Sequence, residues 1–316
     1  METRKILILG GTRFFGPALI AKLRSRMGDA VRLTCFHRGL HLRHDTVPDP
    51  GIPLREGPFS GHGFPVREDA SSDPRITHII GDRHSESEVA DLFRDFWDMV
   101  IDLSGVDERM ITLSLQHASR RCGRYVFISS SSVYTVGGSR PHREDEPVLC
   151  GTGEPYAAAK ILGERLLAEW FPHYTVIRPS KVYGPGNYYF SEMTFLKMIQ
   201  ERRVIALKHD PILHFTYIED LAEGVCALME KDGIFNVAGA ESASLSRFIQ
   251  RIADLHALPV SFVMNEESDV PFTGLSDRIL DLSAAKEAAG WEPAVRLEEG
   301  LKNTFLYLSG ASDRTQ

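Results

Sequence analysis

Short apolar runs alternate with longer segments of helical periodicity through the first half of the chain. The apolar runs, which we expect to be strands, cover residues 5–9, 31–37, 76–80, 99–103, 125–129 and 174–178. The helical segments between them cover residues 16–26, 85–96, 107–122 and 155–171. Strand, crossover helix and strand in repetition predict a parallel sheet. The strands are almost continuously apolar, as in a sheet that helices cover on both faces.

The second half of the chain is less regular. We expect helices near residues 191–202, 217–231, 245–257 and 297–308, and strands at 204–207, 234–237 and 261–264. The pattern predicts an α/β protein with a Rossmann-like doubly wound parallel sheet over residues 1–182. Residues 183–316 are expected to form a smaller C-terminal α/β substrate lobe, with the chain crossing between the two. Ligands of open parallel sheets bind beyond the carboxyl ends of the strands, so the cleft is expected between the lobes.

Charge and apolar content limit the possible partners. The 316 residues include 36 basic and 43 acidic side chains, which gives a net charge of −7 and no general attraction to nucleic acid. The chain has no apolar run near the roughly 20 residues of a membrane helix, and the start shows no secretory segment. We therefore expect a cytoplasmic protein without a membrane segment.

The cysteine and histidine spacings do not indicate a metal site. Cys35, Cys122, Cys150 and Cys226 are scattered, which argues against a disulfide scaffold or a cysteine zinc site. Residues 39–74 are rich in proline and glycine and include three histidines without metal-ligand spacing. A loop of this length is usually functional or mobile, and one possible role is to close over a ligand.

A glycine-rich turn joins the first expected strand to the first expected helix. It consists of Gly10, Gly11, Thr12, Arg13, Phe14, Phe15 and Gly16. Glycine allows a tight reversal and a close helix approach, and the helix N-terminus offers N–H groups to a pyrophosphate. A three-glycine pattern would place glycine at position 13. Arg13 is either tolerated by the loop or serves as a phosphate ligand, and a structural turn without a ligand is the remaining alternative.

The end of the second expected strand bears on the choice of nicotinamide cofactor. A site for NAD usually has a carboxylate there for the ribose 2′-hydroxyl, whereas a 2′-phosphate requires cations. His37 and Arg38 stand at this end and no carboxylate does. We therefore favour NADP over NAD, with a solvated Arg38 as the alternative.

Tyr156 and Lys160 are four residues apart on one face of an expected helix. A phenol with a pKa near 10 must lose roughly 3 pH units to act as a base near neutrality, which requires about 4 kcal/mol of stabilisation of the phenolate. A neighbouring ammonium and an oxidised nicotinamide ring can together supply this in a poorly solvated cleft. Taken alone, the spacing is common on exposed helices. The serines at 129–132 end the preceding strand, where one hydroxyl could hold a substrate oxygen.

In combination, these motifs resemble those of extended short-chain dehydrogenases/reductases of the NAD-dependent epimerase/dehydratase family. The resemblance runs nearly end to end and rests on residues 10–16, 81–83, 125–134, 156, 160, 177–186, 217–222, 235–239 and 290–293. It implies that Tyr156 is the catalytic base or acid, that Lys160 holds the nicotinamide ribose, and that Ser130 is the catalytic hydroxyl. Ser129 and Ser131 stay open as alternatives if the register slips.

The resemblance also implies further contacts. Those to the cofactor are Asp82, Arg83, Leu103, Ser104, Gly105, Ile128, Pro179 and Val182, and those to the substrate are Ser131, Ser132, Lys181, Asn187 and Arg278.

Four departures from the family pattern bear on the substrate. Ser131 and Ser132 replace the Asp-Glu pair of sugar dehydratases, so dehydration is not expected. Lys181 replaces a usual asparagine and Leu213 a usual arginine at the diphosphate of a nucleotide sugar; Lys181 or Arg278 could supply the lost charge. The turn with Arg13 resembles a divergent branch that includes plant chloroplast RNA-binding members, in which the Tyr-Lys pair is not reliably kept.

We therefore expect an NAD(P)-dependent epimerase or reductase that acts on a hydroxyl or keto carbon of a sugar-like or nucleotide-sugar substrate. The helices at 107–122 and 156–171 resemble the pair through which family members dimerise, so we expect a homodimer. The alternative is a nucleic-acid-binding or regulatory protein that keeps the fold without turnover.

Overall fold

The computed structural model describes residues 3–39, 76–134, 141–148, 154–187, 191–201, 204–268, 270 and 277–309. Most of the proline-rich segment 39–74, with His41, His44 and His62, lies outside these residues, as does Cys150.

Seven strands form one parallel sheet, which confirms the predicted Rossmann-like fold. They are β1 (Arg4–Leu9), β2 (Val31–His37), β3 (Ile76–Ile80), β4 (Met99–Asp102), β5 (Tyr125–Ile128), β6 (Tyr174–Pro179) and β10 (Gly233–Val237). Their order is β10-β6-β5-β4-β1-β2-β3, and every neighbouring pair is parallel. The direction of winding therefore reverses between β1 and β4, which makes their carboxyl ends the expected site of a ligand.

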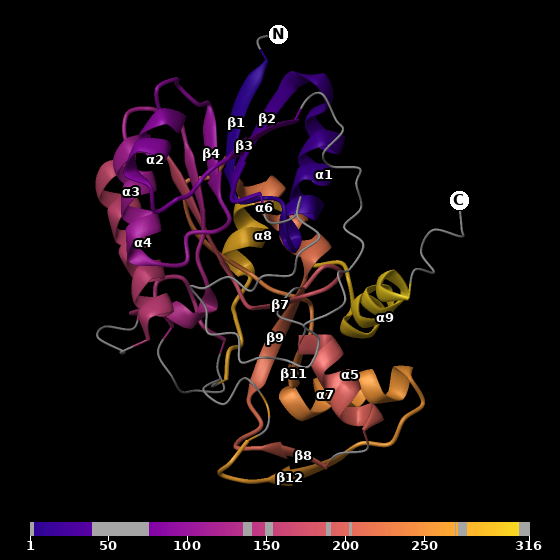
Figure 1. Cartoon of the computed structure of the whole chain (residues 1–316). Helices are drawn as coiled ribbons and strands as arrows, with labels where there is room; N and C mark the ends of the chain where they lie inside the picture. Colours follow the sequence, from indigo (N-terminus) through magenta and orange to yellow (C-terminus); the bar gives the residue numbers. More distant parts are fainter. Residues whose placement is uncertain are drawn as a thin grey trace.

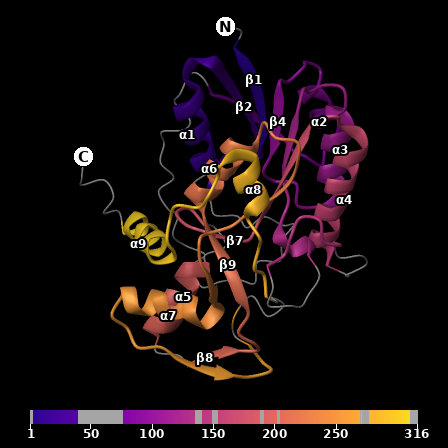
Figure 2. The same cartoon turned by 180° about the vertical axis from the view of Figure 1, so that it is seen from behind.

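Helices cover both faces of this sheet (Figures 1 and 2). One face carries α1 (Phe15–Met27), α6 (Ile218–Leu228) and α8 (Ser283–Ala289). The other carries α2 (Glu86–Leu92), α3 (Glu108–Ala118) and α4 (Pro155–Trp170). Two short 3₁₀ turns, η1 (Gly28–Ala30) and η4 (Ser131–Val133), precede β2 and follow β5.

Burial on both faces explains the unbroken apolar strands. In β1, Ile6 and Ile8 belong to the core cluster that includes α1, whereas Leu7 and Leu9 belong to the cluster that includes α3 and α4. All four side chains are fully or almost fully buried. Alternate residues of a strand point to opposite faces, so a two-sided core requires apolar residues at every position.

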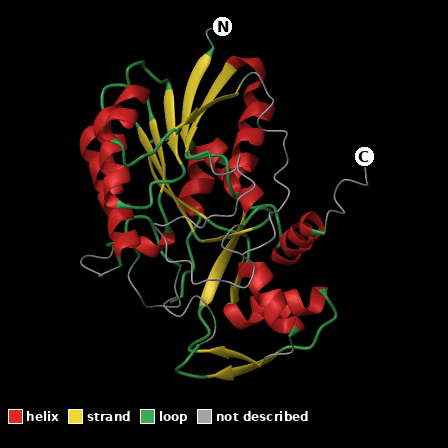
Figure 3. Cartoon of the chain, in the orientation of Figure 1, coloured by secondary structure: helices red, strands yellow, loops and turns green. Residues whose placement is uncertain are grey.

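A smaller lobe lies beyond the carboxyl edge of the sheet (Figure 3). Its three-stranded sheet has the order β11-β9-β7, formed by β7 (Lys181–Tyr183), β9 (Ile212–Tyr217) and β11 (Ser242–Ser244). β8 (Val204–Leu207) pairs with β12 (Ser261–Met264) in a parallel two-stranded sheet. Three helices complete the lobe: α5 (Ser191–Gln200), α7 (Leu245–Leu255) and α9 (Leu297–Leu308). Phe248 of α7 stacks on Phe215 of β9 with ring centroids 4.1 Å apart.

The second half of the chain contributes to both lobes. After building β7, α5, β8 and β9 of the small lobe, it returns to the large sheet as α6 and β10, and α6 packs against α1. It then forms β11, α7 and β12 in the small lobe before α8 contacts α6 and β10. Among the described residues, every helix is too short or too polar to span a bilayer.

Candidate active site

The glycine turn lies at the carboxyl edge of the sheet, between the ends of β1 and β2. The Gly10 N–H donates to the carbonyl of Phe36 at 2.9 Å. Gly10 and Gly11 have φ angles of +101° and +92°, a region that side chains rarely enter. A Cβ on Gly16 would lie 2.4 Å from the Gly11 carbonyl oxygen, so only glycine lets α1 begin this close to the turn.

The start of α1 suits an anion. Its N-cap is Phe14, whose ring carries no oxygen that could accept from the N–H groups of the first helical turn. These N–H groups lie at the carboxyl edge, where the positive end of the helix dipole favours a phosphate. Arg13 is exposed in the same turn and Thr12 is half-buried. The turn therefore fits the pyrophosphate of a dinucleotide.

His37 and Arg38, predicted together as cofactor residues, have different environments. His37 is buried; its Nδ1 accepts from the Gly39 N–H at 3.0 Å, and its Nε2 lies 3.0 Å from His78 Nδ1. Arg38 is exposed. The pKa of Asp82 is lowered chiefly by the His84 backbone N–H, with Arg38 as a smaller contributor, so Arg38 and Asp82 stand near each other.

Arg83 is directed into the protein. Its guanidinium is 5% exposed and forms two hydrogen bonds of 2.7 Å to the fully buried carboxylate of Asp102. Burial opposes both charges, but the ion pair outweighs it, so the pKa of Asp102 is lowered and that of Arg83 is raised. Sequence reasoning placed Arg83 among the cofactor contacts and did not identify Asp102.

Tyr156 and Lys160 stand in the first two turns of α4. Tyr156 is 43% exposed, whereas Lys160 is 2% exposed. The Lys160 ammonium donates to the carbonyl of Ile128 at 2.6 Å and lies 5.5 Å from the centre of the Tyr156 ring. Gly163 permits this approach, since a Cβ there would lie 2.8 Å from the Phe127 ring. The structure thus brings the predicted pair together over the end of β5.

The buried position alters the acidity of Lys160. Burial lowers its pKa from 10.5 to about 8. The nearby carboxylates of Asp102 and Glu164 act in the opposite direction, whereas Arg83 adds to the lowering. Lys160 is therefore a cation at neutral pH that loses its proton under mildly alkaline conditions.

The four serines after β5 have distinct surroundings. Ser129 is buried and donates to Glu164 Oε1 at 2.5 Å. Ser131 is buried in η4. Ser130 is half-buried, and its Oγ accepts from the backbone N–H and the hydroxyl of Ser132 at 3.1 and 2.9 Å. Of the three alternatives, Ser130 has the surroundings best suited to meeting a substrate.

A second buried ion pair supports this region and was not predicted. Glu164 lies four residues after Lys160 on the same helical face and accepts two hydrogen bonds from Arg178, at 3.0 and 2.6 Å. Arg178 also donates to the Tyr134 hydroxyl at 2.9 Å, which donates to Asn236 Oδ1 at 2.7 Å. The network joins α4 and the ends of β6 and β10. The spacing of Glu164 from Lys160 was the available signal in the sequence.

Candidate substrate residues from the small lobe border the same region. Lys181 begins β7 near Glu192, and burial lowers the pKa of Lys181 to about 8. Glu192 is buried and accepts from the Gly184 N–H and the Asn187 amide at 2.9 and 2.8 Å. A Cβ on Gly186 would lie 3.8 Å from Phe14 Cα, so this loop reaches the glycine turn.

Leu213 stands where members of the epimerase/dehydratase family usually have an arginine, and its apolar side chain cannot bind a diphosphate. Leu213 is buried in the core of the small lobe, and Arg278 pairs with it across an isolated parallel bridge. Arg278 Nη2 donates to the carbonyl of Tyr134 at 3.2 Å. Tyr134 directly follows the serine turn, which consists of residues 129–133. Most of the remaining predicted cofactor residues end or follow strands at the carboxyl edge of the large sheet: Leu103, Ser104, Gly105, Ile128 and Pro179. Val182 is the middle residue of β7 in the small lobe.

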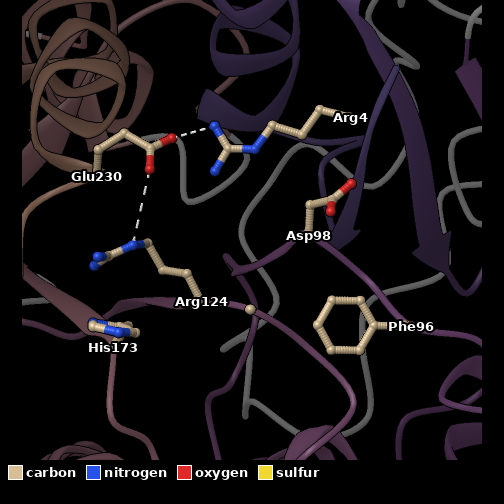
Figure 4. A pocket seen from close by; sticks show the side chains of 7 residues that line it. Arg4, Phe96, Asp98, Arg124, His173 and Glu230 are labelled. Carbon is tan, nitrogen blue, oxygen red and sulfur yellow. Dashed lines mark hydrogen bonds and ion pairs between the residues drawn. The ribbon is translucent and has the colours of Figure 1, made fainter. Parts of the chain in front are cut away.

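A separate pocket of about 310 Å³ lies at the opposite edge of the sheet (Figure 4). Arg4, at the start of β1, pairs there with Glu230, and Arg124 lies 3.9 Å from the same carboxylate. Arg124 also pairs with Asp232 at 2.7 Å. These charges balance one another far along the strands from Tyr156. The described part of the chain contains no group of three or more side chains suited to holding a metal ion.

Comparison with known proteins identifies the family. The sequence profile described as "NAD dependent epimerase/dehydratase family" matches residues 6–238. The chain belongs to this family. The match includes the glycine turn, the serine turn and the Tyr156–Lys160 pair, and it extends into β10.

Two known proteins resemble the chain in sequence. The chloroplast stem-loop binding protein of 41 kDa b from Arabidopsis thaliana is 26% identical over 96% of this chain and 78% of its own length. A UDP-glucuronate 4-epimerase from Thermodesulfobacterium geofontis is 33% identical over 61% of this chain and 62% of its own length. The chain thus matches less than two thirds of that epimerase.

A solved structure matches the fold throughout. It is the UDP-glucuronic acid 4-epimerase from Bacillus cereus in complex with UDP-glucuronic acid and NAD. The TM-score is 0.75 at 21% identity, and the alignment covers 97% of this chain and 99% of that one.

Replacing Lys160 by methionine should abolish a rise in the free energy of unfolding that the wild type shows between about pH 8 and pH 10.5. The pKa of Lys160 is about 8 in the fold against 10.5 ordinarily, so the unfolded wild-type chain binds more protons between these values and its stability rises with pH there. The free energy of unfolding of the variant relative to wild type should therefore fall by about 3 kcal/mol from pH 8 to pH 10.5. Urea unfolding across this range measures the change, with Lys302→Met, which replaces an exposed lysine of α9, as the control. A difference independent of pH would contradict a buried ammonium.

Proposed function

We propose that the chain is an NAD(P)-dependent epimerase or reductase that acts on a hydroxyl or keto carbon of a sugar or nucleotide sugar. The observation that carries this proposal is the buried Lys160 ammonium, held by the Ile128 carbonyl beside the half-exposed ring of Tyr156. A buried cation next to an accessible phenol is an arrangement for proton transfer rather than for packing.

Each group of the site has a role in proton transfer. Lys160 lowers the cost of a negative charge on the phenol oxygen, so Tyr156 can take a proton from a hydroxyl or return one to a ketone. Ser130 Oγ is the acceptor in both of its bonds to Ser132, which leaves its own proton to donate to the substrate oxygen. The bound nicotinamide would supply the hydride acceptor or donor.

The residues that would hold the cofactor are those at the carboxyl edge. The glycine turn and the start of α1 suit the pyrophosphate, Asp82 stands where the adenosine end is expected, and Lys160 is placed to hold the nicotinamide ribose. Arg38 is an exposed cation directly after β2 that can bind a 2′-phosphate, which supports NADP. The B. cereus epimerase was solved with NAD, so NADP is the part of this proposal that needs its own test.

The proposed substrate follows from the chemistry of the small lobe and from the relatives. Lys181, Asn187 and Arg278 can bind an anionic or hydroxyl-rich group, and Ser131 and Ser132 supply no acid–base pair for dehydration. The B. cereus protein carries UDP-glucuronic acid, which supports a nucleotide sugar. Mass spectrometry of nucleotide released from the purified protein separates the two reactions: retained cofactor favours epimerisation, and an exchangeable one favours reduction.

Tyr156→Phe should lower turnover by at least a hundredfold, because the ring stays and the hydroxyl that carries the transferable proton is lost. Affinity for the cofactor should change by less than about twofold. Turnover is measured with a panel of UDP- and dTDP-sugars, and affinity by NADH and NADPH fluorescence. The control is Tyr174→Phe, at the amino end of β6. Undiminished turnover in the Tyr156 variant would refute the proposed role.

Arg38→Ala should weaken NADPH binding about tenfold and leave NADH binding within twofold, because one charge-assisted bond to a phosphate contributes about 1.4 kcal/mol or more. Fluorescence titration with each nucleotide measures this. Arg32→Ala removes an exposed arginine from the same strand away from the carboxyl edge and serves as the control. Equal losses for both nucleotides would contradict a site for the 2′-phosphate.

A second candidate function is binding of an RNA stem-loop without turnover. The Arabidopsis relative, named for stem-loop binding, supports it, since the match covers 96% of this chain. The net charge of −7 and the complete Ser130, Tyr156 and Lys160 set argue against it. Gel-shift titration with a stem-loop RNA distinguishes this candidate from the enzyme. If the chain is an RNA-binding protein, wild type should bind the RNA and Tyr156→Phe should bind it with the same affinity.

We also propose that the chain forms a homodimer through α3 and α4. These helices pack side by side and lie at the outer surface of the large domain (Figure 1). Paired with the same helices of a second copy, they would form a four-helix bundle. Sedimentation velocity at micromolar concentration should give the mass of two chains of 35.4 kDa. A single species at the mass of one chain would contradict the proposal.

A further inference from the structure

The Arg83–Asp102 ion pair connects parts of the carboxyl edge that are not neighbours in the sheet. Arg83 follows β3 and Asp102 ends β4, and both β2 and β1 lie between these strands. Besides Arg83, the Asp102 carboxylate accepts from the N–H groups of Ser104 and Gly105 at 3.1 and 2.9 Å. The pair therefore fixes the turn after β4.

Ser104 carries this connection to the glycine turn. Its Oγ accepts from Arg83 Nη1 at 3.0 Å and donates to the carbonyl of Leu9 at 3.1 Å. Leu9 is the last residue of β1, directly before Gly10. A Cβ on Gly10 would lie 3.0 Å from Ser104 Oγ, so the serine packs against the turn itself.

We propose that Arg83 and Asp102 are positioning residues for cofactor binding, which act through the Ser104 hydroxyl to fix the glycine turn. This inference rests on the proposed function, because it requires that the turn binds a dinucleotide. Under this proposal Arg83 acts from inside the protein and not as a direct contact to the cofactor. Its other bonds run to Ser114 Oγ at 2.8 Å and the Met110 carbonyl at 3.4 Å, both in α3 on the far side from α1.

The energetics of buried ion pairs favour this role over simple stabilisation. Removing both charges from water costs about as much as their attraction returns, so an apolar pair of the same volume is often equally stable. The rigid fork of arginine offers what an apolar pair does not, because it fixes a carboxylate and two hydroxyls at defined distances.

Ser104 and Ser114 form a matched pair for a test. Each accepts one hydrogen bond from the same guanidinium, at 3.0 and 2.8 Å, but only Ser104 also donates to Leu9. Ser104→Ala should raise the Kd for NADH and NADPH at least tenfold. Ser114→Ala should leave both within twofold, although thermal denaturation should show a similar loss of stability for the two variants.

A double variant separates positioning from direct contact. Arg83→Lys keeps the charge but loses the fork, and it should raise the Kd as Ser104→Ala does. If Arg83 acts through Ser104, the Arg83→Lys/Ser104→Ala double variant should bind the nucleotides no more weakly than the weaker-binding single variant. If the two losses of affinity multiply in the double variant, Arg83 does not act through Ser104, and the proposal is overturned. Ser104 would then be a direct ligand of the cofactor.

Amide hydrogen exchange tests the same link without cofactor. In Ser104→Ala, peptides that include residues 9–16 should exchange at least fivefold faster than in wild type or in Ser114→Ala. Equal exchange in the two serine variants would overturn the proposal, even if Arg83→Lys fails to fold. If wild type binds neither nucleotide, the proposed function and this inference both fail. If wild type binds and Ser104→Ala binds equally well, only the inference fails.

Discussion

The contact between the Lys160 ammonium and the Ile128 carbonyl determines the geometry of the site. A lysine buried to this degree needs a hydrogen-bond acceptor, and an interior strand of a sheet, such as β5, offers backbone groups outside the ladder at its ends. The carbonyl at the end of β5 meets this need and fixes the rotation of α4 against the sheet. Tyr156 stands one turn before Lys160 on the same helix, with its ring centre 5.5 Å from the ammonium, and Gly163 makes the short distance between helix and strand possible.

Charge at the carboxyl edge is organised around the same lysine. Two buried carboxylates, Asp102 and Glu164, favour the Lys160 cation, and each is neutralised by its own arginine. The site therefore holds the positive charge of Lys160 in a poorly solvated region. Neither carboxylate is left as an isolated negative charge that would repel the phosphates of a dinucleotide. This balance suits the proton transfer that we propose for Tyr156.

The sequence was sufficient for the large domain and for the residues that lie on regular elements. The β1–α1 turn and the Tyr156–Lys160 spacing could be predicted because each depends on local chain geometry. β7, β9, β11 and α8 were not predicted: three are short, and β9 passes directly into α6 without a turn signal. The two buried ion pairs were not predicted either, since strand order brings Arg83 to Asp102 and Arg178 to Glu164. The spacing of Glu164 from Lys160 was a signal for one carboxylate but not for its arginine partner.

The return of the chain to the large sheet has a consequence for the independence of the two lobes. β10 covers the edge of β6, and α6 covers α1, yet both elements come after the first small-lobe strands. A fragment that ended at residue 182 would expose an unpaired strand edge and an apolar helix face, which are features that promote aggregation. The lobes are thus two regions of one cooperative folding unit, and neither is an interchangeable module that could be grafted onto another enzyme.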